Sequence, residues 1–269
     1  MQEFVYAQCL RCGIIILTNQ PISEDLGKIY PKDYSGWKSR NKIMGHLRSR
    51  NFQRLYKDMK KHSQAQYVLD YGCGNGEFLK SLDKENLNLV GFDFTLDQAE
   101  QSDQRINYVD NFEKVLSMDK FDHIYLLQVI EHLPDPVETM RELSSRLTNN
   151  GIIIIQTPVR EGWDYKIVDT ELWGGWHAPR HFHIWSQGHI EQLAQILDLR
   201  ILEIKYIPSP FLWAETLRVK ITQKRFQKYI SSDKLLFTAF AYALDIFQLR
   251  LRRKTSNIHV VLGRNLPDQ

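Results

Sequence analysis

The chain contains little cysteine and little net charge. Its 269 residues include three cysteines, which are too few for a disulfide framework and agree with a reducing compartment. The formal net charge of +3 is too small to indicate nucleic-acid binding by itself. The N-terminus also lacks a charged segment followed by an apolar signal core. We therefore expect a cytoplasmic protein without a nucleic-acid partner.

Long apolar runs are absent as well. The stretch LLFTAFAYAL covers only Leu235 to Leu244, which is short of the ~20 residues that a membrane-spanning helix needs. The composition, 43% hydrophobic and 25% charged, is that of an ordinary globular chain large enough for one generous core. We therefore expect neither a disordered protein nor an integral membrane protein.

Apolar segments that resemble strands alternate with segments of helical period. The clearest helix is expected at 135–148, where Pro136 suits the first turn. The continuous run from Ile152 to Ile155 is typical of a strand buried on both faces of a parallel sheet. The sequence therefore predicts an α/β, doubly wound fold. The strands expected in its first part are 67–71, 88–94, 106–110, 121–129 and 151–158.

Three glycines at alternate positions follow the first of these strands. Gly72, Gly74 and Gly76 lie in a strand-to-helix turn, which is where such sheets bind ligands at the carboxyl ends of their strands. Their spacing fits neither the dinucleotide fingerprint nor the phosphate loop. Asp70 would repel a pyrophosphate, but it would suit a ligand that carries an ammonium group.

Four motifs in order resemble class I S-adenosylmethionine-dependent methyltransferases. They are VLDYGCGNGEFL, LVGFDF, FDHIYLLQVIEHLPDP and GIIIIQTP, and the resemblance covers roughly residues 41–207 together with 258–264. It implies a Rossmann-like sheet of seven strands, with the last strand, expected at 257–264, antiparallel. It also implies S-adenosylmethionine as the cofactor.

The resemblance assigns the methionine and ribose parts of this cofactor to the first two strands. Asp70 would hold the amino group, and Asp93 would accept both ribose hydroxyls. Asp93 follows the glycine turn by about twenty residues, which is where a ribose is recognised in this architecture. The alternative for Asp93 is that it only forms a turn at the end of the strand. The alternative for the glycines is a loop that binds no ligand. The turn residues that would pass under the methionine are Gly72, Cys73, Gly74 and Gly76.

The remaining cofactor contacts come from three later segments. By the resemblance, Phe94 would pack against adenine, and Asp110 with Asn111 would lie near the adenine amino group. Gln128, at the end of the fourth strand, would lie beside both the methionine part and the acceptor.

A Glu-His pair, Glu131 and His132, follows the fourth strand. It resembles the pair found in ubiquinone-type O-methyltransferases. A hydroxyl acceptor must lose a proton, and His132 is a candidate base because an ordinary histidine titrates near pH 6.5. The alternative is that the pair only caps or orients the next helix.

A second group of histidines lies in WGGWHAPRHFHIWS, residues 173–186. This stretch resembles one in a methyltransferase subfamily common among bacterial enzymes encoded with surface-polysaccharide genes. His177, Arg180 and His181 are therefore candidates to line the acceptor pocket, with either histidine as the base. Packing of a Trp-rich loop is the alternative, and Trp173 equally suits stacking on a sugar or a place in the core.

A metal site at this loop is not expected. The histidines at 177, 181 and 183 have no acidic or cysteine ligand nearby in the sequence, and their spacing matches no standard zinc site. At the N-terminus, Cys9 and Cys12 form a single C-x2-C knuckle, which is half of a zinc ribbon. We interpret residues 1–40 as a segment with a remnant knuckle and 41–269 as the methyltransferase domain.

A basic insertion separates the last two expected strands, 200–207 and 257–264. Within the insertion, 208–256, the part from 218 to 254 carries ten Lys and Arg against two Asp. An apolar helix between basic clusters indicates contact with an anionic membrane surface or with a lipid-linked acceptor. The alternative is a helical lid on the domain or on a second subunit. No nucleic-acid-binding module is recognisable.

The function expected from these features is S-adenosylmethionine-dependent O-methylation of a sugar, glycan or lipid-linked intermediate. A quinone or small aromatic acceptor is the first alternative. A non-catalytic scaffold with the same fold is the second, and the intact cofactor motifs argue against it. The sequence leaves open the acceptor, the atom that is methylated and the oligomeric state.

Overall fold

The structure is a computed structural model of the chain. It describes residues 4–21, 29, 42–82, 85–95, 103–166, 170–222, 235–252 and 254–265. Of the expected insertion, residues 223–234 and 253 lie outside these ranges.

A seven-stranded mixed sheet forms the centre of the molecule, in the order β5-β4-β3-β6-β7-β10-β9. The pairs among the first five strands are parallel, and β10 is antiparallel to both of its neighbours. This confirms the expected α/β sheet with an antiparallel final strand. The strands are β3 (Tyr67–Tyr71), β4 (Asn88–Phe92), β5 (Ile106–Val109), β6 (Phe121–Leu127), β7 (Leu147–Pro158), β9 (Leu199–Tyr206) and β10 (Asn257–Arg264).

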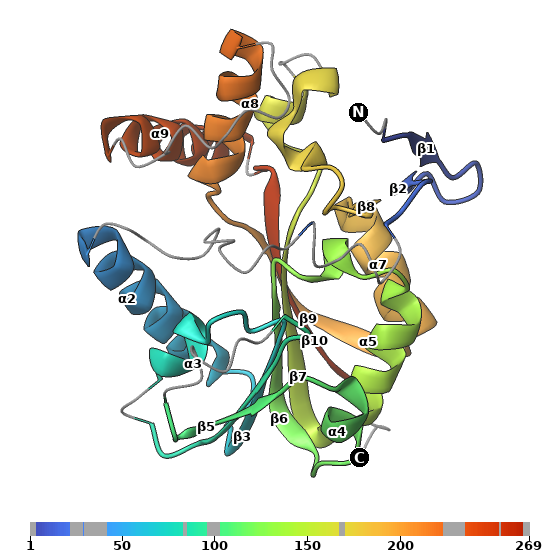
Figure 1. Cartoon of the computed structure of the whole chain (residues 1–269), viewed down its shortest axis with the longest axis vertical. Coiled ribbons are helices and arrows are strands. Elements are labelled where there is room, and N and C mark those ends of the chain that lie inside the picture. The colour runs from blue at the N-terminus through green and yellow to red at the C-terminus, as the bar shows by residue number, and fades with distance from the viewer. Residues whose placement is uncertain are drawn as a thin grey trace.

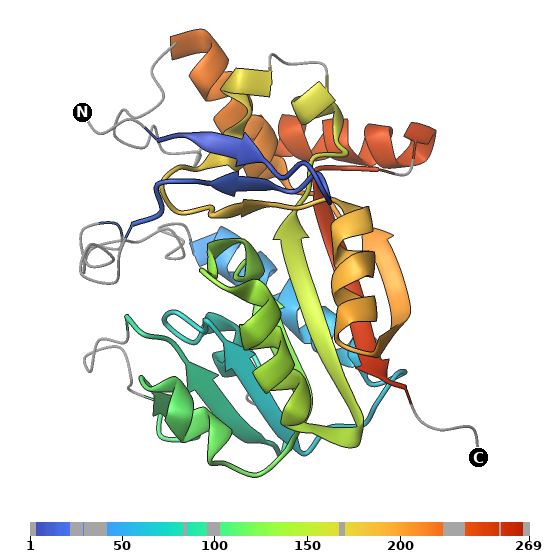
Figure 2. The same ribbon diagram turned by 90° about the vertical axis from the view of Figure 1, so that its right-hand side faces the viewer.

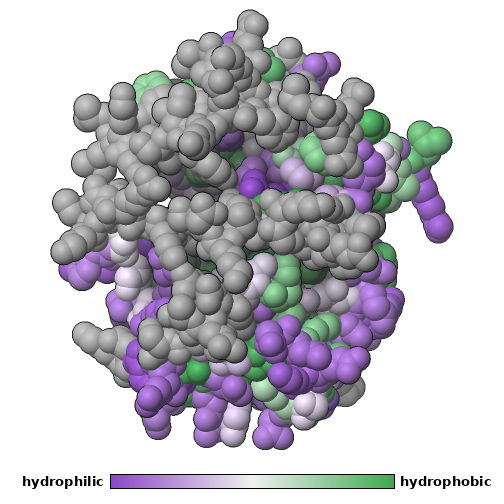
Figure 3. Space-filling model, in the orientation of Figure 1, coloured by the Kyte–Doolittle hydropathy of each residue, from purple (hydrophilic) through white to green (hydrophobic). Residues whose placement is uncertain are grey.

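Helices cover both faces of this sheet. Figure 1 shows α2 (Lys42–Met59) and α3 (Glu77–Lys80) on one side, with α4 (Phe112–Leu116), α5 (Pro136–Ser145) and α7 (Gln187–Ile196) on the other. The described surface in the lower half of Figure 3 is largely hydrophilic, with small hydrophobic areas between. Polar surface is expected there because the apolar sides of these helices face the sheet.

The core is divided by the sheet into two clusters. Within β7, Ile153 and Ile155 pack in one cluster, while Ile152 and Ile154 pack in the other. All four side chains are buried, so the continuous apolar run does mark a strand covered on both faces. These burials fix the register of the strand that leads to the site.

The helix expected at 135–148 is shorter than the sequence suggested. Its start is as predicted, since Asp135 accepts a hydrogen bond from the Glu138 N–H and Pro136 occupies the first turn. It ends at Ser145, however, and Leu147 begins β7. Leu147 is fully buried, and an apolar residue is expected at this position in a helix and in a strand alike. The apolar periodicity of the sequence therefore did not show where the helix gives way to the strand.

A small second sheet lies at the end of the main sheet where the parallel strands terminate. It has the order β1-β2-β8, with β1 (Tyr6–Gln8), β2 (Ile15–Leu17) and β8 (His183–Ile184). Figure 2 shows the β1-β2 hairpin crossing above the main sheet. The N-terminal segment is therefore paired to the loop that follows β7, and the boundary at residue 41 stays a prediction. The loop also contains α6 (Trp163–Lys166), η4 (Thr170–Leu172) and η5 (Gly174–Trp176).

The described residues of the insertion include two helices, α8 (Pro210–Thr222) and α9 (Leu235–Arg252), at the same end of the molecule (Figure 1). The inner side of α9 carries Asp245, whose carboxylate accepts hydrogen bonds from the Ser209 N–H at 2.7 Å and the Trp213 Nε1–H at 2.9 Å. Among the described helices none combines the length and hydrophobicity of a membrane span.

Candidate active site

The glycine turn after β3 is held against β4. The N–H groups of Gly72 and Cys73 both donate to the Phe92 carbonyl, at 2.7 and 2.9 Å. All three glycines have positive φ, a region that favours glycine. A Cβ on Gly72 would also lie 2.5 Å from Val129 Cγ2. The close approach of Val129, in the segment between β6 and η3, to the turn is therefore possible only with glycine here.

Asp70 lies at the end of β3, just before the turn, and is 4% exposed. Burial, with a smaller contribution from the charge of Asp93, raises the pKa of its carboxyl from 3.8 to about 8. Within the described ranges no lysine or arginine pairs with it. A buried carboxyl without a cationic partner is well suited to a ligand that brings its own ammonium group.

Asp93 ties the same turn to the end of β4. Its Oδ2 accepts the Gly74 N–H at 2.9 Å, and its Oδ1 accepts the Thr95 N–H at 2.8 Å and the Thr95 hydroxyl at 2.6 Å. These bonds orient the carboxylate but leave acceptor capacity for a diol. The neighbouring Phe94 is 56% exposed, a position consistent with its predicted place against adenine, which stays a prediction.

The other cofactor candidates have local partners. Asn111 caps α4 by accepting the Glu113 N–H at 2.8 Å, and Asp110 accepts a hydrogen bond from Lys114 Nζ at 3.1 Å. Their roles beside adenine stay predictions. Cys73 packs under β4, where burial raises the pKa of its thiol, so it contributes shape and not a nucleophile.

Gln128 directly follows β6 and has a left-handed backbone, φ 62°. Its N–H donates to the Gln156 carbonyl at 2.7 Å, and its side-chain amide donates to Asn257 Oδ1 at 3.3 Å. Positive φ at a residue other than glycine is uncommon and concentrates at functional sites. The position agrees with the predicted role beside the acceptor, which remains a prediction.

Two contacts of the turn could not be expected from the sequence. Val129 closes over Gly72, as described above, and Tyr108 from β5 closes over Gly76, where a Cβ would lie 2.3 Å from the Tyr108 hydroxyl. That hydroxyl is buried and has no hydrogen-bond partner in the described chain. Burial raises the pKa of Tyr108 to about 12. It is a polar group available to a ligand in the turn.

The three candidate histidines come together although they belong to two segments. The ring centroids of His132 and His181 are 4.8 Å apart, and those of His177 and His181 are 5.0 Å apart. Burial lowers the pKa of His132 to about 4 and of His177 to about 3, and the pKa of His181 falls well below its usual value. The imidazoles are therefore neutral at pH 7.

Glu131 does not cap the following helix, because Asp135 does so. Its Oε2 accepts the Thr157 hydroxyl at 2.8 Å, and its side chain is buried. No acidic residue lies near the loop histidines in the sequence, but folding brings one close: Glu131 Oε1 is 3.9 Å from Nε2 of His132, which packs on His181. The approach depends on chain folding and has no sequence signal.

Two tryptophans of the loop have different environments. Trp173 is 2% exposed and donates its Nε1–H to Asp164 at 2.9 Å, so it belongs to the core and not to a sugar-stacking surface. Trp176 is half-buried and packs against Tyr6 of the hairpin with ring centroids 4.8 Å apart. His183 packs on Trp185, with centroids 6.0 Å apart.

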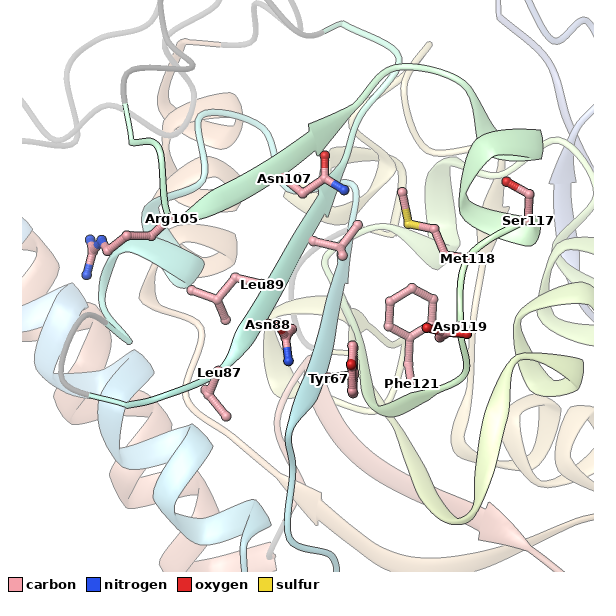
Figure 4. A pocket seen from close by; sticks show the side chains of 11 residues that line it. Tyr67, Leu87, Asn88, Leu89, Arg105, Asn107, Ser117, Met118, Asp119 and Phe121 are labelled. Carbon is pink, nitrogen blue, oxygen red and sulfur yellow. The ribbon is translucent and has the colours of Figure 1, made fainter.

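A cavity of about 470 Å³ lies at the amino ends of the strands, opposite the glycine turn (Figure 4). None of the predicted site residues lines it. Its walls come from the starts of β3, β4, β5 and β6 and from the segment after α4, so it lies on the wrong edge of the sheet for the ligand site of this architecture.

Comparison with known proteins agrees with this geometry. A family model described as "Methyltransferase domain" matches residues 37–204. The chain is 29% identical over 152 residues to the Ubiquinone biosynthesis O-methyltransferase of Rickettsia bellii, a match covering 51% of this chain and 63% of that protein. It therefore spans less than two thirds of that relative.

Two solved structures share the fold. One is a SAM-dependent methyltransferase from Archaeoglobus fulgidus, with TM-score 0.51, 18% identity and coverage of 81% of this chain and 94% of that one. The other is the plantazolicin methyltransferase BpumL in complex with a monoazolic desmethylPZN analog and SAH, with TM-score 0.51, 19% identity and coverage of 83% and 84%.

Proposed function

Because the chain belongs to the S-adenosylmethionine-dependent methyltransferases, we propose that it methylates a hydroxyl oxygen of a sugar, glycan or lipid-linked intermediate. The observation that carries the proposal is the group of neutral imidazoles next to the glycine turn. Val129 touches Gly72, and His132 follows Val129 by three residues in the chain. This contact supports a site in which the acceptor lies beside the cofactor.

The residues of the turn fit the cofactor. Buried Asp70 suits its ammonium group, Asp93 has acceptor capacity for its ribose, and exposed Phe94 offers a face for adenine. When bound, the cofactor supplies an electrophilic methyl group on a sulfonium. The chain's own residues position the acceptor and exclude water, which can contribute roughly 7–11 kcal/mol.

Transfer to a hydroxyl forms a C–O bond and breaks the C–S bond, whose electron pair stays on sulfur. The hydroxyl proton must leave, and His132, His177 and His181 are the candidates to accept it or to orient the hydroxyl. Of the Glu-His pair, His132 is the more accessible, since its side chain is 20% exposed whereas that of Glu131 is 1% exposed.

A quinone or small aromatic acceptor is the second candidate, and it is favoured by the name of the relatives in Rickettsia and Coxiella, "Ubiquinone biosynthesis O-methyltransferase". The sugar and aromatic acceptor classes are distinguished by measuring S-adenosylhomocysteine release with sugar nucleotides, a lipid-linked sugar, extracted glycan and simple catechols. We expect release with a sugar-containing acceptor only. Release with catechols alone would replace this proposal by the aromatic one. Absence of any S-adenosylhomocysteine binding by calorimetry would instead support the scaffold alternative.

The insertion supports a lipid-linked or membrane-surface acceptor. Gly174 in η5 donates its N–H to Thr216 of α8 at 2.9 Å, so the insertion packs on the loop that carries His177 and His181. On α9, the outward side chains of Phe240, Phe247 and Leu251 are 53–59% exposed, while the polar Gln248 is buried. An apolar surface with basic residues at its ends suits an anionic lipid surface.

We expect vesicles containing anionic lipid to bind the protein, and the double substitution Phe240→Asp/Phe247→Asp to weaken this binding by about tenfold or more, because two apolar rings of the binding surface become charged. The measurement is co-sedimentation with anionic and neutral vesicles. Ile196→Asp on α7, also an exposed apolar residue at 60% exposure, serves as the matched control. Equal binding of the double variant and the wild type would indicate a lid without membrane contact.

A further inference from the structure

Three side chains from two distant segments form a compact group of potential metal ligands. One ligand atom from each of Glu131, His132 and His181 lies within 4.8 Å of the other two. Glu131 and His132 belong to η3 (Ile130–His132), and His181 lies between η5 and β8. The backbone holds the two segments together, because the Phe182 N–H donates to the Glu131 carbonyl at 2.8 Å.

The two histidines are oriented as metal-bound histidines usually are. Nδ1 of His132 lies 2.8 Å from the Arg180 carbonyl, and Nδ1 of His181 lies 2.7 Å from the Gly175 carbonyl. A carbonyl oxygen only accepts, so each Nδ1 carries the proton and each Nε2 is the unprotonated nitrogen, which is the form that ligates a metal. A metal-ligating histidine typically donates its other ring N–H in this way.

The carboxylate has an unused oxygen. Glu131 is 1% exposed, and while its Oε2 accepts from Thr157, its buried Oε1 has no hydrogen-bond partner in the described chain. The 3.9 Å separation between Oε1 and His132 Nε2 is too long for a hydrogen bond. A buried carboxylate oxygen without a partner is unfavourable, and a cation would satisfy it.

We propose that Glu131, His132 and His181 bind a divalent cation of the zinc type through one carboxylate oxygen and two imidazole nitrogens. Two histidines and one carboxylate are a known ligand set for zinc sites that keep a fourth position open. With metal–ligand distances of about 2.0–2.2 Å, the three side chains must close by roughly 1 Å around the ion. The sequence-based expectation of no metal considered His177, His181 and His183, which is a different set.

The charge balance indicates what occupies the fourth position. Glu131 contributes one negative charge to a divalent ion, and the two imidazoles, which would ligate in their neutral form, contribute none. The site therefore retains excess positive charge and favours an anionic oxygen. If the proposed function holds, on which this step rests, that oxygen is the acceptor's hydroxyl, which would lose its proton more readily beside the cation. His132 and His181 would then be ligands and not the base, which leaves His177 as the candidate to accept the proton.

The test measures metal binding directly, without cofactor or acceptor. The full chain is stripped with a chelator and titrated with Zn²⁺ by calorimetry and with Co²⁺ by visible absorption. The parent protein for the test carries Cys9→Ser and Cys12→Ser, because the N-terminal knuckle offers two thiols of its own. We expect one equivalent to bind to this parent, with the absorption of a nitrogen- and oxygen-ligated cobalt ion.

Glu131→Gln and His181→Gln in that parent are expected to weaken metal binding by more than about 100-fold. Loss of a residue that only hydrogen-bonds to a metal ligand already lowers metal affinity by about 10–100-fold. His46→Gln, at an exposed histidine of α2, is the matched control and should bind as the parent does. Undiminished S-adenosylhomocysteine binding by the variants shows that they are folded. Binding that is absent from the parent, or unchanged in both cluster variants, overturns the proposal without touching the methyltransferase function.

Discussion

Replacing Asp93 by Ala is expected to reduce affinity for S-adenosylhomocysteine by about 100-fold or more, because hydrogen bonds to a charged group contribute about 1.5–3 kcal/mol each. The carboxylate has two functions in the structure. It accepts the Gly74 N–H and both donors of Thr95, and it retains acceptor capacity for a ribose. Its loss removes the ligand contact and also releases the turn from β4.

Calorimetry at constant pH measures this effect. Asp119→Ala is the matched control, since Asp119 is an exposed acid on the rim of the cavity at the opposite edge of the sheet. Asp93→Asn separates the two functions, because an amide oxygen can still accept the Gly74 N–H while the charge is gone. Affinity unchanged in Asp93→Ala would place the cofactor elsewhere on the molecule.

Replacing Asp70 by Asn is expected to have opposite effects on stability and on binding. Burial, assisted by the charge of Asp93, raises the pKa of Asp70 from 3.8 to about 8 in the folded chain. The folded state therefore keeps this proton to higher pH than the unfolded state. Through this group, stability is greatest below about pH 4 and falls as the pH rises from 3.8 to about 8. The neutral amide removes that fall.

Thermal unfolding at pH 5 and pH 8 tests the stability effect. We expect Asp70→Asn to raise the unfolding temperature relative to the wild type, and to raise it more at pH 8 than at pH 5. The free-energy difference at pH 8 is on the order of a few kcal/mol. Asp58→Asn, at an exposed position of α2, should change neither value. A lower unfolding temperature at both pH values would contradict the burial argument.

The same variant is expected to bind S-adenosylhomocysteine about tenfold or more weakly, because the ligand's ammonium group loses a charged partner. A substitution that stabilises the free protein while it lowers the affinity for the ligand indicates that the original side chain is retained for binding. Equal affinity would show that the amino group is held elsewhere, although the sheet and the turn would be unaffected.

Local sequence was enough to predict the sheet and the glycine turn after β3. The run Ile152 to Ile155 indicated a strand buried on both faces, and the alternating glycines after β3 indicated a ligand turn. Such features depend on one segment at a time. Strand ends, turn glycines and a helix cap such as Asp135 are determined by backbone conformation and by near neighbours, and these are encoded locally.

The acceptor side depends on contacts between distant segments. Glu131 and His132 are about fifty residues from His181, and no spacing rule relates them. Trp173 suited either a sugar surface or the core, and its bond to Asp164 in the structure shows that it belongs to the core. In the same way, Leu147 suited a helix or a strand equally well, because the apolar pattern predicts that the residue is buried but not which element it belongs to.

The sequence by itself thus determined an α/β sheet and the residues of the glycine turn, because each follows from the conformation of a short segment, while the resemblance of its motifs indicated the methyltransferase family. Only the tertiary structure placed Val129 on Gly72, Tyr108 on Gly76 and Glu131 beside the two histidines. Those contacts arise from side-chain packing between elements far apart in the chain, where the geometry is set by the whole core and not by any local pattern.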